Sequence, residues 1–172
     1  MIQLGFPTVS LYPNTGIMFE NHGGTIIFKG QCRIGNNSYI SIGPKAVVEF
    51  GNRFFATTTL RLTSYNNIVI GNHTTFGWET LIMDTDFHKL TKLTGGYSKG
   101  YAPIHIGAYN WFGNGCRIMK RTETPDYCIV QAGTTLSSMI NVPAYSVIGN
   151  NSNIVVKAAE VWMNIDDDKI DY

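Results

Sequence analysis

The residues best suited to proton transfer lie together in one short segment, which ends at His88. Asp84, Asp86 and His88 occupy alternate positions, so in an extended strand their side chains would point to the same side. An imidazole, with an unperturbed pKa of about 6.5, accepts a proton readily at neutral pH, and a neighbouring carboxylate can orient the ring. The segment therefore predicts a general base at His88, oriented by Asp86 or Asp84.

The sequence offers no comparable candidate for a covalent nucleophile or a metal site. No serine or cysteine is placed beside a base in a recognisable nucleophile motif. The three cysteines, Cys32, Cys116 and Cys128, include no C-x-x-C pair, which predicts reduced thiols in the core and neither a disulfide framework nor a zinc site. We therefore expect direct proton-transfer chemistry with no metal ion.

Composition limits the class of protein to which the chain can belong. Of its 172 residues, 44% are apolar, which is enough to bury one core in a single domain. Thirteen lysines and arginines against twelve acidic residues give a formal net charge of +1, which argues against binding to nucleic acid. The N-terminal residues do not resemble a signal peptide, and no apolar run is long enough for a transmembrane segment. We expect a cytoplasmic protein.

The elements that must position the Asp84–His88 segment follow a six-residue repeat. Neither a helix, with a period of 3.6, nor a strand, with a period of 2, produces it. Short strands joined by tight corners do, because each points one large apolar side chain into a narrow core before turning at Gly or Asn. We therefore predict an all-β solenoid, whereas a sandwich would alternate at two. Counting in sixes gives Ile106, Phe112, Ile118, Thr124, Val130, Leu136, Val142, Ile148 and Ile154, of which only Thr124 is polar.

Three segments depart from this repeat. Residues 89–103 are polar and contain Gly95-Gly96, so we expect an extended loop there, and long loops on compact scaffolds are more often functional than idle. Residues 1–27 have weak periodicity and are expected to cap the solenoid, which would span residues 28–157. Residues 158–172 would form a C-terminal tail, and the whole chain 1–172 would be one domain.

Several stretches resemble the bacterial hexapeptide-repeat acyltransferases, which include sugar and capsule O-acetyltransferases. Residues 71–88 resemble the Asp-x-His element of that family, which opens an extended loop. Residues 103–115, PIHIGAYNWFGNG, resemble its P-I-x-I-G-x-x-x-W-I-G motif. AGTTL at residues 132–136 and VPAYSVIGN at residues 142–150 resemble two further motifs. The resemblance implies a single-stranded left-handed parallel β-helix, with an O-acetyltransferase activity that takes its acetyl group from acetyl-CoA.

The resemblance also assigns residues to the acyl donor. It implies that Trp111 lies against the pantetheine arm of coenzyme A and that Ala132 and Gly133 bind the amides of that arm through their backbone. Ser138, in a pair of serines where the family has Thr-Lys, and Lys157 would complete the donor site. Lys120 and Arg121 are further candidates for contacts with the phosphates. The family's homotrimer would place the donor in a groove between neighbouring chains.

The acceptor is less constrained by the sequence. The resemblance favours a saccharide or a polysaccharide precursor, on which Tyr97 and Tyr101 could stack, with His73 lining the cleft. A nucleotide-sugar N-acetyltransferase is the main alternative. A γ-carbonic-anhydrase-like zinc lyase on the same fold is less favoured because the chain has no two histidines five residues apart. A non-catalytic solenoid would need neither His88 nor coenzyme A.

Overall fold

The chain folds as a β-solenoid, as the six-residue repeat predicts. The computed structural model describes residues 1–149 and 154–163, and within these ranges it contains nineteen strands and no helix. The strands form three parallel sheets, which we call faces A, B and C, apart from one antiparallel pair at the C-terminal end. No helix in this part of the chain is long and apolar enough to cross a membrane.

Each coil of the solenoid contributes one strand to each face. Face A contains β1 (Ile2–Phe6), β4 (Cys32–Gly35), β7 (Phe54–Ala56), β10 (Thr75–Phe76), β13 (Trp111–Phe112), β16 (Ile129–Val130), β18 (Val147–Gly149) and β19 (Ile154–Lys157). Face B contains β2 (Ile17–Asn21), β5 (Ser38–Ile42), β8 (Arg61–Ser64), β11 (Leu81–Met83), β14 (Arg117–Met119) and β17 (Thr135–Leu136). Face C contains β3 (Thr25–Phe28), β6 (Val47–Phe50), β9 (Asn67–Ile70), β12 (Ile104–Ile106) and β15 (Glu123–Thr124).

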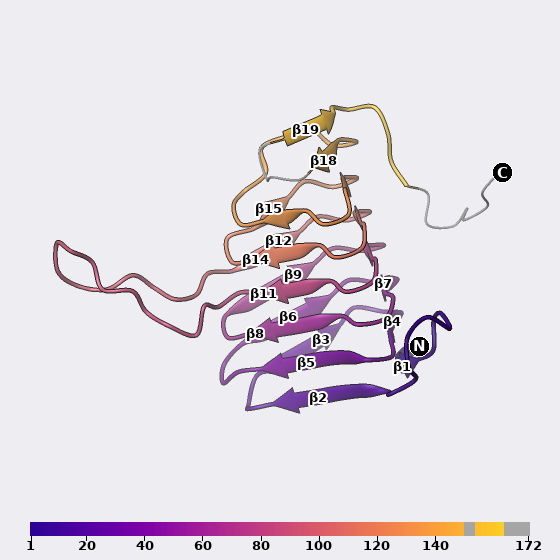
Figure 1. Cartoon of the computed structure of the whole chain (residues 1–172), viewed down its shortest axis with the longest axis horizontal. Helices are drawn as coiled ribbons and strands as arrows, with labels where there is room; N and C mark the ends of the chain where they lie inside the picture. The colour runs from indigo at the N-terminus through magenta and orange to yellow at the C-terminus, as the bar shows by residue number, and fades with distance from the viewer. Residues whose placement is uncertain (150–153, 164–172) are drawn as a thin grey trace.

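The coils wind in the left-handed sense. In Figure 1 the strands of face B lie in front and point left, after which the chain passes behind through face C and returns on the right through face A, rising from the N-terminal end. This hand is opposite to that of nearly all parallel crossover connections. It agrees with the hand that the resemblance implies. Periodicity alone carries no information about hand.

The register of the coils explains the period of six. Ile106 pairs with Thr124, Phe112 with Val130 and Ile118 with Leu136, so each coil takes eighteen residues and each face takes six. Their side chains point inward and are buried, and rings such as Phe76 and Phe112 stack at 4.5 Å within the core. Earlier coils are longer, since Ile34 pairs with Ala56, and this accounts for the slip in the repeat before residue 60.

The two ends close the solenoid differently from our expectation. The structure places β1, β2 and β3 beside β4, β5 and β6 in faces A, B and C, so the residues expected to form a separate cap are the first coil. At the other end, β19 pairs antiparallel with β18, which stops the parallel ladder from continuing. Residues 158–163 of the expected tail follow this strand, and residues 164–172 lie outside the described part of the chain.

The extended loop forms a narrow antiparallel arm, residues 86–101. It leaves the solenoid after β11 and returns before β12, on the edge between faces B and C, which we call the arm edge. Isolated bridges join Thr85 to Tyr101 and Thr91 to Tyr97, and the tip turns at Gly95 and Gly96, which have φ of 88° and 80°. Figure 1 shows the arm standing away from the solenoid on the side opposite β4 and β7.

Candidate active site

The predicted catalytic segment does not form the continuous strand that its alternation suggested. β11 ends at Met83, and Phe87 has a φ of 60°, a left-handed conformation that turns the chain between Asp86 and His88. The alternation of side chains is therefore lost, and the three predicted catalytic residues point in different directions. Our expectation that they share one face was wrong.

Asp84 is fully buried and holds the corner of the preceding coil. Its carboxylate accepts hydrogen bonds from Ser64 Oγ at 2.7 Å, from Tyr65 N at 2.7 Å and from Asn66 N at 3.0 Å. Burial raises the pKa of this carboxyl, and the hydrogen bonds oppose that shift. Asp84 thus fixes Tyr65, whose ring is part of the pocket described below.

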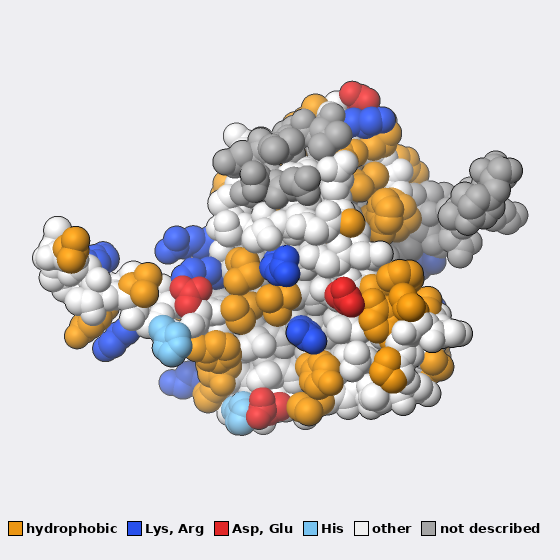
Figure 2. All heavy atoms as spheres, viewed as in Figure 1, with side chains coloured by type: hydrophobic (Ala, Val, Ile, Leu, Met, Phe, Trp, Pro, Cys, Tyr) orange, Lys and Arg blue, Asp and Glu red, His pale blue; other side chains and the backbone are white. Residues whose placement is uncertain are grey.

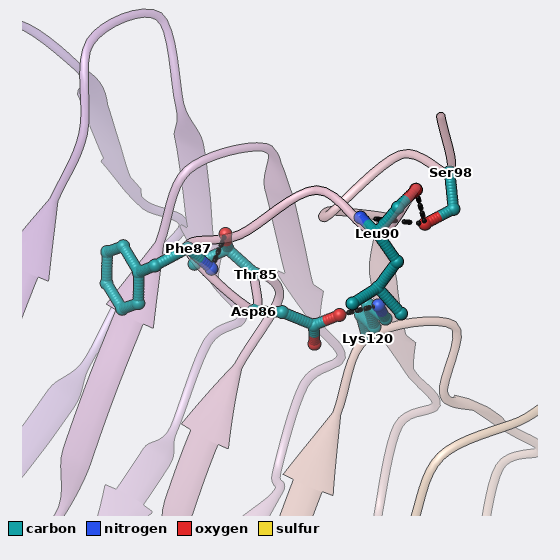
Figure 3. A network of polar contacts seen from close by, with 6 residues as sticks. All are labelled: Thr85, Asp86, Phe87, Leu90, Ser98 and Lys120. Carbon is teal, nitrogen blue, oxygen red and sulfur yellow. Dashed lines mark hydrogen bonds and ion pairs between the residues drawn. The ribbon is translucent and has the colours of Figure 1, made fainter. Parts of the chain in front are cut away.

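Asp86 anchors the base of the arm to the next coil. Its carboxylate forms an ion pair with Lys120, which follows β14 on the arm edge. Figure 3 shows this pair below the start of the arm, together with the hydrogen bond that Phe87 N donates to Thr85 Oγ1 at 3.0 Å. Lys120, which we considered as a contact for the coenzyme A phosphates, is therefore paired with Asp86.

His88 lines a pocket at the root of the arm. The pocket has a volume of about 540 Å³ and is lined mainly by aromatic side chains, with one ammonium group: Tyr65, Thr85, Phe87, His88, Lys89 and Tyr101. The rings of Tyr65 and Phe87 meet edge to face at 5.1 Å. This root pocket combines an exposed imidazole with apolar ring surfaces, an arrangement that suits a sugar whose hydroxyl must lose a proton.

The two predicted acceptor tyrosines lie on the arm. Tyr101 lines the root pocket with His88. Tyr97 lies further out, where it is 60% exposed and carries the Lys89 ammonium 4.0 Å from its ring centroid. The third acceptor candidate, His73, lies far from this group, on the edge between faces C and A, where its ring stacks on Tyr109 at 4.6 Å.

The predicted donor residues are spread over the solenoid. Trp111 projects outward from face A and is 39% exposed, between Thr75 and Ile129 in register. Ala132 and Gly133 form the exposed corner between faces A and B. Ser138 follows β17 on the arm edge, and Lys157 ends β19. One chain therefore keeps Trp111 apart from His88, with the whole of face C between them.

The other histidines and the thiols show no comparable site. His105 Nδ1 lies 3.5 Å from Glu123 Oε1, and His22 Nε2 lies 3.0 Å from Glu20 Oε1. The three cysteines are buried and free, and burial raises the pKa of Cys116 to about 11. Residues 1–149 and 154–163 contain no group of three His, Cys, Asp or Glu side chains that could hold a metal ion.

The sequence analysis predicted two of the residues that line the root pocket, His88 and Tyr101, and missed Tyr65, Thr85, Phe87, Lys89 and Gly100. Phe87 stood between two candidates but does not fit the six-residue repeat, and Lys89 was treated only as the start of the loop. Tyr65 belongs to the preceding coil, so only the coil register brings it to His88. In this coil the register offset is twenty residues, so Thr85 of the catalytic segment corresponds to Tyr65. The sequence alone does not give the length of that coil.

Comparisons with known proteins relate the fold to acetyltransferases. No family model matches the sequence, and no curated protein matches it. Among solved structures, the polySia-specific acetyltransferase NeuO is similar with a TM-score of 0.64 at 17% identity, covering 90% of this chain and 75% of that one. A hexapeptide-repeat acetyltransferase from Vibrio cholerae O1 biovar eltor, complexed with acetyl coenzyme A, has a TM-score of 0.63 at 15% identity, covering 80% and 73%.

A third structure gives the same result. The maltose O-acetyltransferase of Clostridium difficile 630 has a TM-score of 0.58 at 21% identity, covering 83% of this chain and 71% of that one. At these identities the comparisons establish a shared fold. They confirm the expected resemblance to the hexapeptide-repeat acetyltransferases at the level of architecture.

Proposed function

We propose that the protein is an acetyltransferase that moves an acetyl group from acetyl-CoA to a hydroxyl of a saccharide. The observation that carries this proposal is the root pocket, where His88 lies among aromatic rings at the base of the longest excursion from the described solenoid. The shared fold supports it, because all three similar structures are named as acetyltransferases and one of them holds acetyl coenzyme A.

In this mechanism His88 acts as the general base. The acceptor hydroxyl gives its proton to the imidazole as its oxygen attacks the thioester carbonyl. The tetrahedral intermediate then collapses by breaking the carbon–sulfur bond, and the departing thiolate takes the proton from the imidazolium. No acyl-enzyme forms, since the three thiols are buried and burial raises the pKa of each.

The proposal gives Asp86 and Asp84 a structural part in place of the orienting part that the sequence suggested. Asp86 is closer to the pocket in sequence and is partly exposed, but it is paired with Lys120. Asp84 contributes through the corner at Tyr65. In the proposed site Asp86 and Asp84 therefore position the walls of the pocket, while His88 touches the acceptor.

The groups assigned to the donor fit a site shared between chains. Trp111 offers an exposed ring, and the corner at Ala132 and Gly133 offers exposed backbone, but both belong to face A or its edge and not to the arm edge. Acetyl-CoA bound there would supply the thioester. We propose a homotrimer in which the arm edge of one chain faces Trp111 of its neighbour, with Ser138 and Lys157 as further donor contacts.

Face B supports self-association of the chain. Its outward side chains include Leu81, Met83 and Met119, which are half-buried in the single chain. Figure 2 looks onto this face and shows hydrophobic side chains near its centre, with basic side chains beside them. An apolar surface on a regular sheet is typical of a surface that packs against another protein.

The experiment is a screen of acetyl transfer. Purified protein is incubated with acetyl-CoA and neutral sugars, acidic sugars or nucleotide sugars, while release of free thiol and the gain of one acetyl group on the acceptor are followed. The proposal expects an acetyl product that mild alkali removes, as for an ester. A product resistant to alkali would favour the N-acetyltransferase alternative. Absence of both turnover and acetyl-CoA binding would favour a non-catalytic solenoid.

A further inference from the structure

The arm concentrates positive charge in a chain that is nearly neutral overall. Residues 87–102 contain Lys89, Lys92 and Lys99 and no acidic residue, while the whole chain has a formal net charge of +1. Each of the three lysines is exposed, and none forms an ion pair with a residue that the structure describes. Figure 2 shows hydrophobic and basic side chains together along the arm.

The hydrogen-bond register of the arm places two of these lysines opposite each other. Ser98 N donates to Leu90 O at 2.8 Å, and a bridge joins Thr91 to Tyr97. Continuing this antiparallel register by one position sets Lys89 across from Lys99. Residues directly opposite in an antiparallel pair project from the same side, and like charges there destabilise the pair. Two ammonium groups placed in this way would repel each other, and an anion between them would relieve that repulsion.

Tyr97 lies on the same side of the arm as these two lysines. The Lys89 ammonium sits 4.0 Å from the Tyr97 ring centroid, which agrees with the alternation of side chains along the arm. Lys92 alternates to the other side, with Leu90 and Ser98. One side of the arm thus presents an exposed ring flanked by two ammonium groups, and Lys89 also lines the root pocket that contains His88.

We propose that Lys89, Tyr97 and Lys99 form a subsite for a negatively charged sugar of the acceptor, which makes the acceptor an acidic saccharide. The ring of the sugar packs on Tyr97, and its carboxylate or phosphate lies between the two ammonium groups. This inference rests on the proposed function for the identity of the acceptor. It adds the charge of that acceptor and the residues that select it.

A chain of acidic sugars fits the arrangement better than a single sugar. The root pocket, at about 540 Å³, is within the usual range of volumes for ligand sites, and Lys89 connects it to the subsite at Tyr97. One sugar would present its hydroxyl to His88 while a neighbouring sugar occupies the arm. Leu90, which is exposed on the other side of the arm, would suit a membrane surface, which the test below includes.

The test measures binding, so it is independent of turnover. An oligogalacturonide, which carries a carboxylate on every sugar, is titrated against the full-length protein and compared with its methyl ester, which keeps the sugars and removes the charge. An oligomer of sialic acid and a phosphodiester-linked glycan serve as further acidic probes. The inference expects at least one acidic probe to bind, more weakly as salt is raised, and the ester to bind least.

Matched variants locate the subsite on the arm. The single changes Lys89→Gln and Lys99→Gln should each weaken binding of the acidic probe, by about tenfold when combined, and Tyr97→Ala should weaken it too. Lys92→Gln, which removes the same charge from the other side of the arm, should weaken it by less than about twofold. All three sites are exposed, so the fold should survive, and this is checked by thermal unfolding.

Several outcomes would overturn the inference. One is that no acidic probe binds. Another is that Lys92→Gln weakens binding as much as Lys89→Gln does, since that would mean diffuse attraction without a subsite. Polyglutamate or anionic lipid vesicles binding as tightly through Lys89 and Lys99 would also contradict a saccharide site. Loss of acetyl transfer with retained selective binding would instead count against the proposed function alone.

Discussion

Asp84 illustrates how a buried carboxylate can support a site that it does not touch. Three donors from residues 64–66 converge on its two oxygens, and burial raises the pKa of the group. The network closes the corner before β9 and presents Tyr65 to the root pocket. A residue that looked catalytic from its spacing thus has a structural contribution that is visible in its hydrogen bonds.

Replacing Asp84 by asparagine should destabilise the protein. Asp84→Asn puts an NH₂ group where an oxygen accepts from backbone N–H groups, so one buried donor loses its partner, at a cost of about 1–3 kcal/mol. Asp86→Asn removes only a partly exposed ion pair and should change the free energy of unfolding by about 1 kcal/mol or less. Urea unfolding of both variants measures the difference. Equal losses would show that the network at Asp84 does not stabilise the fold.

The buried thiols predict loss of stability at alkaline pH. Burial raises the pKa of Cys32 to about 12 and that of Cys116 to about 11, from an ordinary value of 9.0. The folded chain therefore keeps protons that the unfolded chain releases. This contribution to stability is fully present below pH 9.0 and is lost as the pH rises from there through about 11 and 12.

The free energy of unfolding should fall, between about pH 9 and pH 10.5, by up to about 1.4 kcal/mol per pH unit for each buried thiol. A variant with Cys32→Ala and Cys116→Ala is expected to be less stable at neutral pH, because of the cavities, but to have a shallower slope. Identical slopes for the two proteins would contradict the protonation of these thiols in the folded state.

Sequence reasoning at this scale selected His88 and Tyr101, which both line the root pocket, but not the other residues around them. His88 could be predicted because it follows directly on a break in the apolar repeat. Its relation to Asp84 and Asp86 could not, because φ at Phe87 is positive and this reverses the direction of the next side chain. A local conformation that L-residues seldom adopt leaves no signal in the spacing of residue types.

At the level of elements, the corner glycines of the solenoid have a different cause from the one we expected. Gly71 and Gly107 do not adopt positive φ. Their absent side chains allow the next coil to approach, since a Cβ on Gly71 would lie 2.5 Å from Ala108 N. The left-handed conformation falls two positions later, at His73 and Tyr109. The sequence still predicted the positions of the corners, because glycine occurs both where the backbone turns and where another segment approaches it closely.

The aromatic residues at these corners compensate for their strained backbone. The rings of His73, Tyr109, Tyr127 and Tyr145 form a stacked column with centroids 4.6 to 4.8 Å apart. Each left-handed residue costs roughly 1 kcal/mol, and each ring pair returns a similar amount. Through this column His73 supports the edge between faces C and A, which is not the edge that carries the arm.

Shortening the arm should affect the acceptor and spare the donor. Replacing residues 90–98 by Gly-Gly keeps the bridge between Thr85 and Tyr101 but removes Tyr97 and Lys92. The KM for the saccharide should rise by about tenfold or more, because the outer contacts are lost, while the KM for acetyl-CoA changes little. Steady-state kinetics with each substrate varied in turn gives both values. Equal increases in the two KM values would contradict a specific contribution of the arm to acceptor binding.

For the whole molecule, the roles proposed for His88 and Trp111 lead us to expect a site that is shared between chains. The arm edge lies opposite face A (Figure 1), and Trp111 projects from face A, so under this proposal the two residues at one thioester come from different chains. The overall fold could be predicted from the period of six. How chains would associate could not be predicted from this period, because association depends on the outward side chains, whose types the repeat does not determine.

Mixed trimers test this arrangement. Chains with His88→Ala and chains with Trp111→Ala are each expected to be nearly inactive at limiting acetyl-CoA. Assembled together from equal amounts, they should recover about a quarter of the wild-type activity, because that share of sites pairs an intact His88 with an intact Trp111 of the neighbour. A mixture that stays inactive, or a protein that is a fully active monomer in light scattering, would contradict a shared site.

The most direct test of the account is the rate of acetyl transfer by His88→Ala. His22→Ala is the control, because His22 lies in the turn between β2 and β3, three coils from β11 and the arm. The account predicts a loss in kcat of about 10²- to 10⁴-fold for His88→Ala, with unchanged acetyl-CoA affinity, an intact fold and no acetylated protein. It also predicts that wild-type kcat/KM falls on the acid side, since a protonated imidazole accepts no proton. A His88→Ala protein as active as the control would contradict it.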